Sequence, residues 1–156
     1  MVDPGPHVLS SGEIADIMEI EQLLARYAVA MTTFDMDMVR SVFTADGTYS
    51  AFGDTYTVDE FPALADAAPR GLFMTGTPLL EFDGDTATGT QPLCFVSQLD
   101  HYLRIGCWTD SFLRTEGGWR LRARSMTFLR RSGARDSGIP HDPLRPVPAG
   151  AQSEAD

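Results

Sequence analysis

Two tyrosines are candidates for hydrogen-bond chemistry in this chain. Tyr27 falls on the apolar face of a predicted helix, and Tyr49 falls in a short predicted strand. A tyrosine with its ring in an apolar environment and its hydroxyl in a cavity can hydrogen-bond a substrate oxygen. The alternative is a core aromatic residue whose hydroxyl is satisfied within the protein. The sequence leaves both interpretations open for each tyrosine.

Asp110 is the third candidate, because it alternates with Trp108 and Phe112 along a predicted strand. Successive side chains of a strand point to opposite faces, so these three share one face. A carboxylate beside two aromatic rings is either a partly desolvated general base or an ion-pair partner. The partner would be Arg104 or another arginine across the strands.

His101 and Gln91 are weaker candidates. His101 follows Asp100 in a predicted hairpin turn, where it either faces water or supplies a proton-transfer group at the mouth of a cavity. Gln91 lies in a largely apolar strand and either binds a ligand oxygen or faces water. A turn centred on Asp100-His101 would place Cys94 opposite Cys107, as reduced and buried thiols. The spacing of histidines and cysteines predicts no metal site.

The elements that must position these residues differ between the two halves of the chain. Capping signals at Ser10, Asp35 and Thr57 predict helices at about 10–32, 35–43 and 57–68, with a strand at 48–52. Four strand-like runs follow, at 72–82, 86–99, 102–115 and 118–131, with tight turn signals at 83–85 and 116–118. Helices followed by long strands predict an α+β fold, in which a curved, mixed sheet forms a cone around the three N-terminal helices and encloses a single pocket.

The composition bounds the function. The chain has 156 residues and 43% hydrophobic content, which suits one domain at 10–132, between a flexible segment at 1–9 and a Pro/Gly-rich, disordered tail at 133–156. A net charge of -10 argues against nucleic acid as a partner. The sequence predicts no membrane span and no signal peptide, and we expect a cytoplasmic protein. No nucleotide-binding motif is present, so no cofactor is expected.

The last strand run suggests self-association. Arg120, Arg122 and Arg124 alternate there and predict a face built for water. The same alternation assigns Met126 and Phe128 to that face. Apolar groups on an otherwise polar face are typical of an interface, so we expect a homodimer.

Several motifs resemble the SnoaL-like branch of the nuclear transport factor 2-like superfamily. They are Tyr27 on the first helix, the FTADGTY run that ends at Tyr49, the DGDTA turn at 83–87 and the RTEGGWR segment at 114–120. The resemblance covers about residues 13 to 131. It implies a pocket that serves dehydratases, isomerases and polyketide cyclases, and in other members binding or assembly alone.

The resemblance also implies positions for an acid–base pair. Dehydratase-like members use a helix carboxylate five residues after the tyrosine and a strand histidine four residues before the Asn/Thr-Pro pair. In this chain those positions hold Thr32 and Phe73, which cannot transfer protons at neutral pH.

The sequence therefore predicts a cofactor-independent enzyme of the cyclase, isomerase or dehydratase type. Its substrate would be an apolar polycyclic or polyketide-like small molecule. The alternative is a non-catalytic binding or assembly domain. The candidate residues are Tyr27, Tyr49, Asp110 and His101 for catalysis, and Thr32, Phe73, Trp108, Gln91, Phe95 and Met31 for binding.

Overall fold

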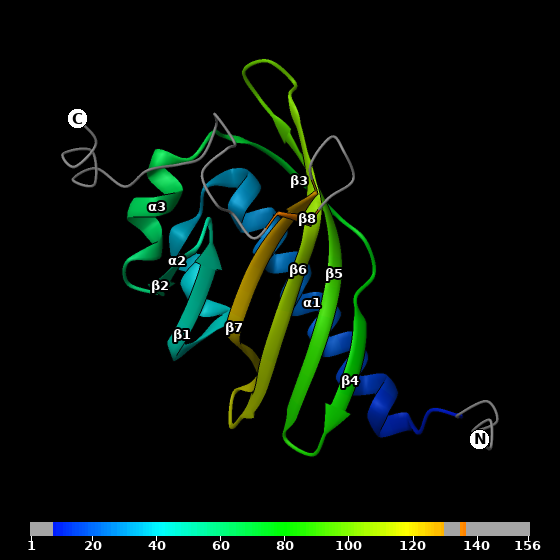
Figure 1. Cartoon of the computed structure of the whole chain (residues 1–156). Helices are drawn as coiled ribbons and strands as arrows, with labels where there is room; N and C mark the ends of the chain where they lie inside the picture. Colours follow the sequence, from blue (N-terminus) through cyan, green and yellow to red (C-terminus); the bar gives the residue numbers. More distant parts are fainter. Residues whose placement is uncertain (1–7, 130–134, 137–156) are drawn as a thin grey trace.

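The computed structural model describes residues 8–129 and 135–136 as helices, strands and connecting turns (Figure 1). The helices are α1 (Ser11–Thr33), α2 (Met36–Ser41) and α3 (Phe61–Ala67). The strands are β1 (Phe43–Ala51), β2 (Asp54–Thr57), β3 (Gly71–Thr75), β4 (Leu79–Asp83), β5 (Thr86–Ser97), β6 (Leu103–Thr115), β7 (Gly118–Leu129) and β8 (Arg135–Asp136).

In the described part of the chain, the strands form one eight-stranded sheet in the order β2-β1-β7-β6-β5-β3. β4 also pairs with β5, and β8 pairs with β7. β1 is parallel to β7, whereas the other pairs are antiparallel. Figure 1 shows α1 running behind the long strands, with α2 and α3 beside β1. The predicted α+β fold with a curved, mixed sheet is confirmed.

The predicted capping signals form, with one difference. Ser10 Oγ accepts a hydrogen bond from the Glu13 amide, and the Glu13 carboxylate accepts one from the Ser10 amide. Asp35 caps α2 through a single hydrogen bond, which its Oδ1 accepts from the Met38 amide. Thr57 N also donates to the Glu60 carboxylate, but the helix that follows begins only at Phe61. The third helix is therefore shorter than predicted.

The predicted strand at 72–82 is two strands, β3 and β4, separated by residues 76–78. Pro78, which has no amide to donate to a ladder, lies in this break. The predicted tail at 133–156 includes β8, in which Arg135 pairs with Leu129. The remainder of the predicted tail, at 133–134 and 137–156, and residues 1–7 of the predicted flexible start at 1–9 lie outside the described residues.

A β-bulge in β7 overturns the prediction for its arginines. Ser111 pairs with Ala123 and Phe112 pairs with Leu121, so Arg122 is the extra residue. One inserted residue shifts the alternation by one position. Arg122 is exposed, but Arg124 is only 1% exposed and faces the core. Met126 and Phe128 face inward with Arg124, so the predicted interface on that face is wrong.

The register of β5 and β6 also differs from the prediction. Cys94 pairs with Ile105, and Cys107 pairs with Pro92, so the two cysteines are diagonal rather than directly opposite. Both are unpaired thiols and partly buried. Among the described residues, none of the helices combines the length and apolar character needed to cross a membrane.

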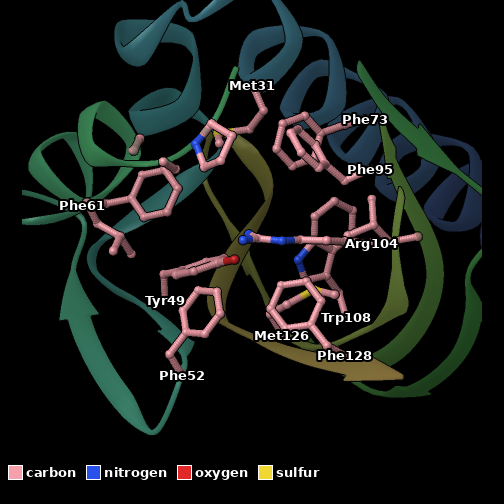
Figure 2. Close-up of a pocket in the computed structure, with 15 residues that line it drawn as sticks. Met31, Tyr49, Phe52, Phe61, Phe73, Phe95, Arg104, Trp108, Met126 and Phe128 are labelled. Carbon is pink, nitrogen blue, oxygen red and sulfur yellow. The ribbon is translucent and has the colours of Figure 1, made fainter. Parts of the chain in front are cut away.

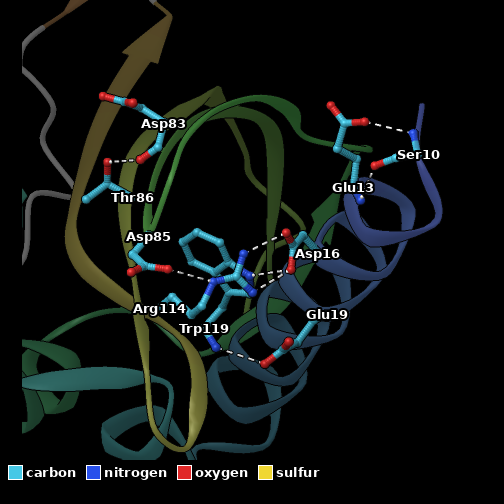
Figure 3. A network of polar contacts seen from close by, with 9 residues as sticks. All are labelled: Ser10, Glu13, Asp16, Glu19, Asp83, Asp85, Thr86, Arg114 and Trp119. Atoms are coloured by element: carbon cyan, nitrogen blue, oxygen red, sulfur yellow. Dashed lines mark hydrogen bonds and ion pairs between the residues drawn. The ribbon is translucent and has the colours of Figure 1, made fainter. Parts of the chain in front are cut away.

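A polar network fixes α1 to the β6–β7 end of the sheet (Figure 3). The Arg114 guanidinium donates two hydrogen bonds of 2.7 Å to Asp16 and one of 3.1 Å to Asp85. It also lies 4.4 Å from the ring centroid of Trp119, whose indole N–H donates to Asp16 at 3.1 Å. Glu19 accepts a hydrogen bond from the Trp119 amide. Because these hydrogen bonds join α1 to Trp119 of β7, which is fully buried, the network sets where α1 crosses the sheet.

We expect Asp16→Asn to lower the melting temperature at pH 7 by several degrees. Hydrogen bonds from Arg114 hold the pKa of Asp16 below its ordinary value of 3.8. The ionised carboxylate therefore stabilises the fold above that pH, and the contribution disappears as the pH falls below it. Thermal unfolding followed by circular dichroism should show the difference from wild type shrinking near pH 3. Asp66→Asn, which affects only an exposed pair with Arg70, is the control. A variant as stable as wild type at pH 7 would contradict this role.

Candidate functional site

A cavity of about 70 Å³ opens between the helices and the inner face of the sheet (Figure 2). Apolar side chains from α1, α3 and the strands form most of its wall: Met31, Phe52, Phe61, Leu64, Phe73, Leu93, Phe95, Met126 and Phe128. A concave site with an apolar wall and a few polar groups is typical of small-molecule binding.

Aromatic side chains in contact with one another make one side of this wall rigid. The Phe73 ring lies 5.0 Å from the ring of Phe95 and is stacked at 6.3 Å on Trp108. On the opposite side, Tyr49 meets Phe61 edge-on at 4.7 Å. Aromatic rings resist rearrangement when they pack in this way, so the cavity has a defined shape before a ligand enters.

Three polar groups turn toward one another in the middle of this apolar ring. Figure 2 shows the hydroxyl of Tyr49, the guanidinium of Arg104 and the indole nitrogen of Trp108 meeting there. Arg104 is 8% exposed, with its guanidinium carbon 5.9 and 5.7 Å from the ring centroids of Phe52 and Phe128. The Trp108 nitrogen is buried and makes no hydrogen bond of good geometry among the described residues, but its N–H lies close enough to the Tyr49 hydroxyl to lower the pKa of that hydroxyl.

Tyr49 is a hydrogen-bond donor at neutral pH. Burial raises the pKa of its hydroxyl, and the nearby Trp108 indole N–H and the charge of Arg124 only partly oppose the rise. A phenol that holds its proton can donate to a substrate oxygen but cannot remove a proton from carbon.

A buried ion pair lies beneath the Trp108 side of the cavity. Arg124 donates hydrogen bonds of 2.8 and 2.7 Å to the two oxygens of Asp110, and a third of 3.3 Å to Gln91. Its guanidinium carbon lies 4.0 Å from the ring of Trp108 and 4.4 Å from the ring of Tyr27. Burial alone lowers the pKa of Arg124, but the charge and hydrogen bonds of Asp110 raise it overall. Arg124 therefore stays charged, sandwiched between two rings.

Five of the predicted site residues line the cavity: Met31, Tyr49, Phe73, Phe95 and Trp108. Asp110 does not. It faces inward with Trp108, as the alternation predicts, but both of its oxygens accept hydrogen bonds from Arg124. The ion-pair alternative therefore holds, with Arg124 rather than Arg104 as the partner. A carboxylate committed to a buried guanidinium is a poor general base.

The other predicted residues have structural contacts or lie elsewhere. Tyr27 is 1% exposed and packs edge-on against Trp108, behind the cavity wall. Gln91 is buried and spans from Arg124 to the Gly76 carbonyl. His101 lies in the exposed β5–β6 turn and not in the cavity wall.

Thr32 ties α1 to β3. Its hydroxyl donates to the Ala28 carbonyl at 2.8 Å and accepts from the Phe73 amide at 3.1 Å. The two positions where the resemblance places an acid–base pair are therefore neighbours in space. Here one holds the helix against the strand, and the other contributes a ring to the wall.

The sequence analysis did not identify Arg104 as a residue of the cavity wall. It stands four residues before Trp108 in the same strand, so strict alternation from Trp108 points it inward. That signal was present in the sequence. Met126 and Phe128 were missed because the bulge at Arg122 reverses their orientation.

Comparison with known proteins gives a consistent result. The model of a family described as SnoaL-like domain matches residues 12–125. An uncharacterized protein of Mycobacterium tuberculosis, Rv2910c, is 32% identical and aligns over 77% of this chain and 90% of its own length.

Solved structures show the same fold. A single-residue variant of Rv3472 of Mycobacterium tuberculosis, a protein of unknown function, has a TM-score of 0.70 and 28% identity, over 76% of this chain and 75% of its own. The hexachlorocyclohexane dehydrochlorinase LinA-type3 of Novosphingobium barchaimii LL02 has a TM-score of 0.68 and 16% identity, covering 81% of this chain and 93% of its own.

We expect Asp110→Asn to lower the free energy of unfolding by about 3–5 kcal/mol, because it leaves the Arg124 charge buried without a counter-ion. Replacing both residues, as Asp110→Leu with Arg124→Met, should cost less than the single change, since no charge then remains buried. Urea denaturation measures both effects, with the exposed Asp46→Asn as a control. An ordinary hydrogen bond contributes about 1 kcal/mol to stability. If the free energy of unfolding of Asp110→Asn differs from that of wild type by no more than about this amount, the ion pair is not needed for the fold.

Proposed function

Because the chain belongs to the SnoaL-like domain family, we propose that it is a cofactor-independent enzyme of the cyclase or isomerase kind. Its substrate is an apolar small molecule with a polyketide-like or polycyclic skeleton. One observation carries the proposal: an aromatic cavity whose described wall offers hydrogen-bond donors and no carboxylate or histidine. Such a site suits a reaction that depends on shape and on polarisation of an oxygen.

The proposed chemistry begins with the fold of the substrate inside the cavity. Rigid rings on opposite sides restrict a flexible chain to few conformations, and orientation alone can lower a barrier by about 7–11 kcal/mol. In a cyclisation, the enol form of a β-dicarbonyl unit attacks a second carbonyl of the same molecule, and the new carbon–carbon bond forms as the π bond of that carbonyl breaks. The Tyr49 hydroxyl donates to the oxygen on which negative charge develops, and the enol O–H proton is lost to water. An enolised substrate supplies its own nucleophile, so no group in the described wall has to take a proton from carbon. A donor fixed in an apolar site stabilises that charge more than water does.

Elimination of water fits the cavity less well. It needs a group that takes a proton from carbon, and the positions suited to such groups hold Thr32 and Phe73. Thr32 already makes two hydrogen bonds to the backbone, and Phe73 is stacked on Trp108. Movement of a double bond needs the same removal of a proton from carbon, so within the proposed kind of enzyme we favour cyclisation of an enolised substrate, without net loss of water, over isomerisation and over dehydration.

A non-catalytic binding domain is the second candidate, and the same two residues favour it. If Thr32 and Phe73 serve only to hold and line the cavity, the chain would bind an apolar molecule without converting it. The two candidates differ in whether a bound molecule is changed.

The test is conversion of a panel of linear poly-β-keto compounds and unsaturated cyclic ketones, followed by mass spectrometry and NMR. We expect a product of unchanged mass from at least one compound. Tyr49→Phe should lower its rate of formation by about 10- to 1000-fold, because it removes the donor to the developing charge.

Tyr102→Phe is the matched control, since Tyr102 lies beside the β5–β6 turn and not in the cavity wall. Loss of water as the main reaction would contradict the assignment to a cyclase or isomerase. Tight binding of a compound that remains unchanged would support the binding domain instead.

We also propose that the chain forms a homodimer, through a different face from the one that the sequence indicated. The outer face of β3, β5 and β6 carries exposed Leu72, Met74, Leu103 and Ile105. In the register, Leu72–Val96–Leu103 and Met74–Cys94–Ile105 form two adjacent rows without charge. Each copy carries a net charge of -10, so two copies repel each other least when they meet through an uncharged face. We therefore assign a second copy of the chain to this face.

We expect the wild-type protein to have the mass of a dimer in light scattering at micromolar concentration. Ile105→Glu should shift it to a monomer without unfolding it, because the residue is exposed and its substitution places a charge within the proposed contact. Thr88→Glu, at an exposed position on the same face of β5 but several residues from these rows, is the control. A wild-type monomer would refute the dimer.

A further inference from the structure

The cavity is small for a substrate of several rings. Its volume is about 70 Å³, whereas sites for small molecules usually enclose about 300–1,000 Å³. A molecule of two or more fused rings therefore needs space that side chains of the wall now occupy. At least one of these side chains must give way when such a molecule binds.

Phe52 differs from the other wall residues in its backbone. The register of β1 with β2 pairs Ala51 with Asp54, so Phe52 and Gly53 form a two-residue loop. Both have positive φ, 56° for Phe52 and 84° for Gly53, as a type I′ turn requires. Glycine, asparagine and aspartate suit the first of these positions, whereas a bulky side chain there strains the backbone. The hairpin itself therefore does not explain a phenylalanine at position 52.

The side chain of Phe52 explains its place in the turn. The ring is directed into the cavity, where it forms part of the wall and packs against Phe128 with 5.2 Å between the ring centroids (Figure 2). The residue is only 6% exposed, although it lies in a turn. Backbone strain persists where surrounding contacts hold it in place, and such strain gathers at ligand sites. The position of the ring in the cavity is therefore the reason for the strained turn.

This turn is also the part of the wall that moves most easily. β2 lies at the end of the strand order and pairs with β1. Apart from its chain neighbours, no described residue has an atom within 4 Å of the position that a Cβ on Gly53 would occupy, so the tip of the hairpin can shift. By contrast, Phe95 and Trp108 lie in β5 and β6 and are paired on both sides. Movement of the turn also releases the strain at Phe52.

We propose that Phe52 sets the size of the ligand, because a larger ligand takes the place of its ring. This inference rests on the proposed function and specifies its substrate: a fused-ring skeleton that fills both the present cavity and the space of the Phe52 ring. The displaced ring turns outward with the tip of the hairpin, while the rings of Phe73, Phe95 and Trp108 keep their places. A smaller molecule leaves Phe52 where it is.

Calorimetric binding of pyridine, quinoline and acridine, each in its neutral form, tests the proposal on the full chain. The three probes share one ring nitrogen, which can accept a hydrogen bond from Tyr49, and differ in the number of fused rings. We expect Phe52→Ala and Phe52→Gly to bind acridine about 10- to 100-fold more tightly than wild type, since apolar contact worth one methylene group contributes about fourfold in affinity. The affinity for pyridine should be unchanged.

Phe82→Ala is the matched control, because it removes a ring that packs against Trp119 and not one of the cavity wall. It should leave all three affinities unchanged. Phe52→Gly should also have a higher melting temperature than Phe52→Ala, because glycine adopts a positive φ without strain, whereas at an ordinary position it is the less stable of the two. The reverse order would contradict the strained turn.

If both Phe52 variants bind acridine no more tightly than wild type, the assignment of Phe52 is overturned, and the proposed function stands as long as wild type binds one of the probes. If none of the three binds to any of these proteins, the cavity is refuted as a ligand site and the proposed function falls with it. Phe52→Leu, which keeps an apolar side chain, should show part of the gain for acridine and keeps the test decisive where the smaller side chains prevent folding.

Discussion

The buried ion pair between Arg124 and Asp110 is the interaction on which the site depends. Charges can be buried this deeply only when their hydrogen bonds are well made, and here two bonds of 2.8 and 2.7 Å join the partners. The pair links β6 to β7, reaches β5 through Gln91, and touches α1 through the ring of Tyr27. Because Arg124 also lies against Trp108, it fixes the ring that forms the cavity wall. The buried ion pair therefore sets the position of the Trp108 side of the cavity wall.

Much of the fold could be predicted from local patterns. The caps at Ser10 and Asp35, the turns around Gly84 and Gly118, and the alternation of Trp108 with Asp110 all depend on residues near in sequence, and the structure confirms them. Both turn glycines have positive φ, which few other residues adopt.

The parts that could not be predicted depend on distant residues. Pairing between β6 and β7 creates the bulge at Arg122, and no local pattern in β7 announces it. That one inserted residue decides that Arg124, Met126 and Phe128 face inward. The partner of Asp110 was ambiguous for the same reason, since any arginine on a neighbouring strand satisfied the pattern. The role of Thr32 likewise depends on Phe73, forty-one positions away.

The parallel pairing of β1 with β7 constrains how the chain reaches this structure. β1 ends at Ala51, and its sheet neighbour on one side spans Gly118–Leu129. During synthesis, the nascent chain must expose the helices and β1 long before that neighbour leaves the ribosome. Contacts between such distant segments form late, because the intervening chain must first be ordered. The aromatic and methionine side chains that later enclose the cavity are unprotected in that interval, which is the period when chaperones can act on the chain.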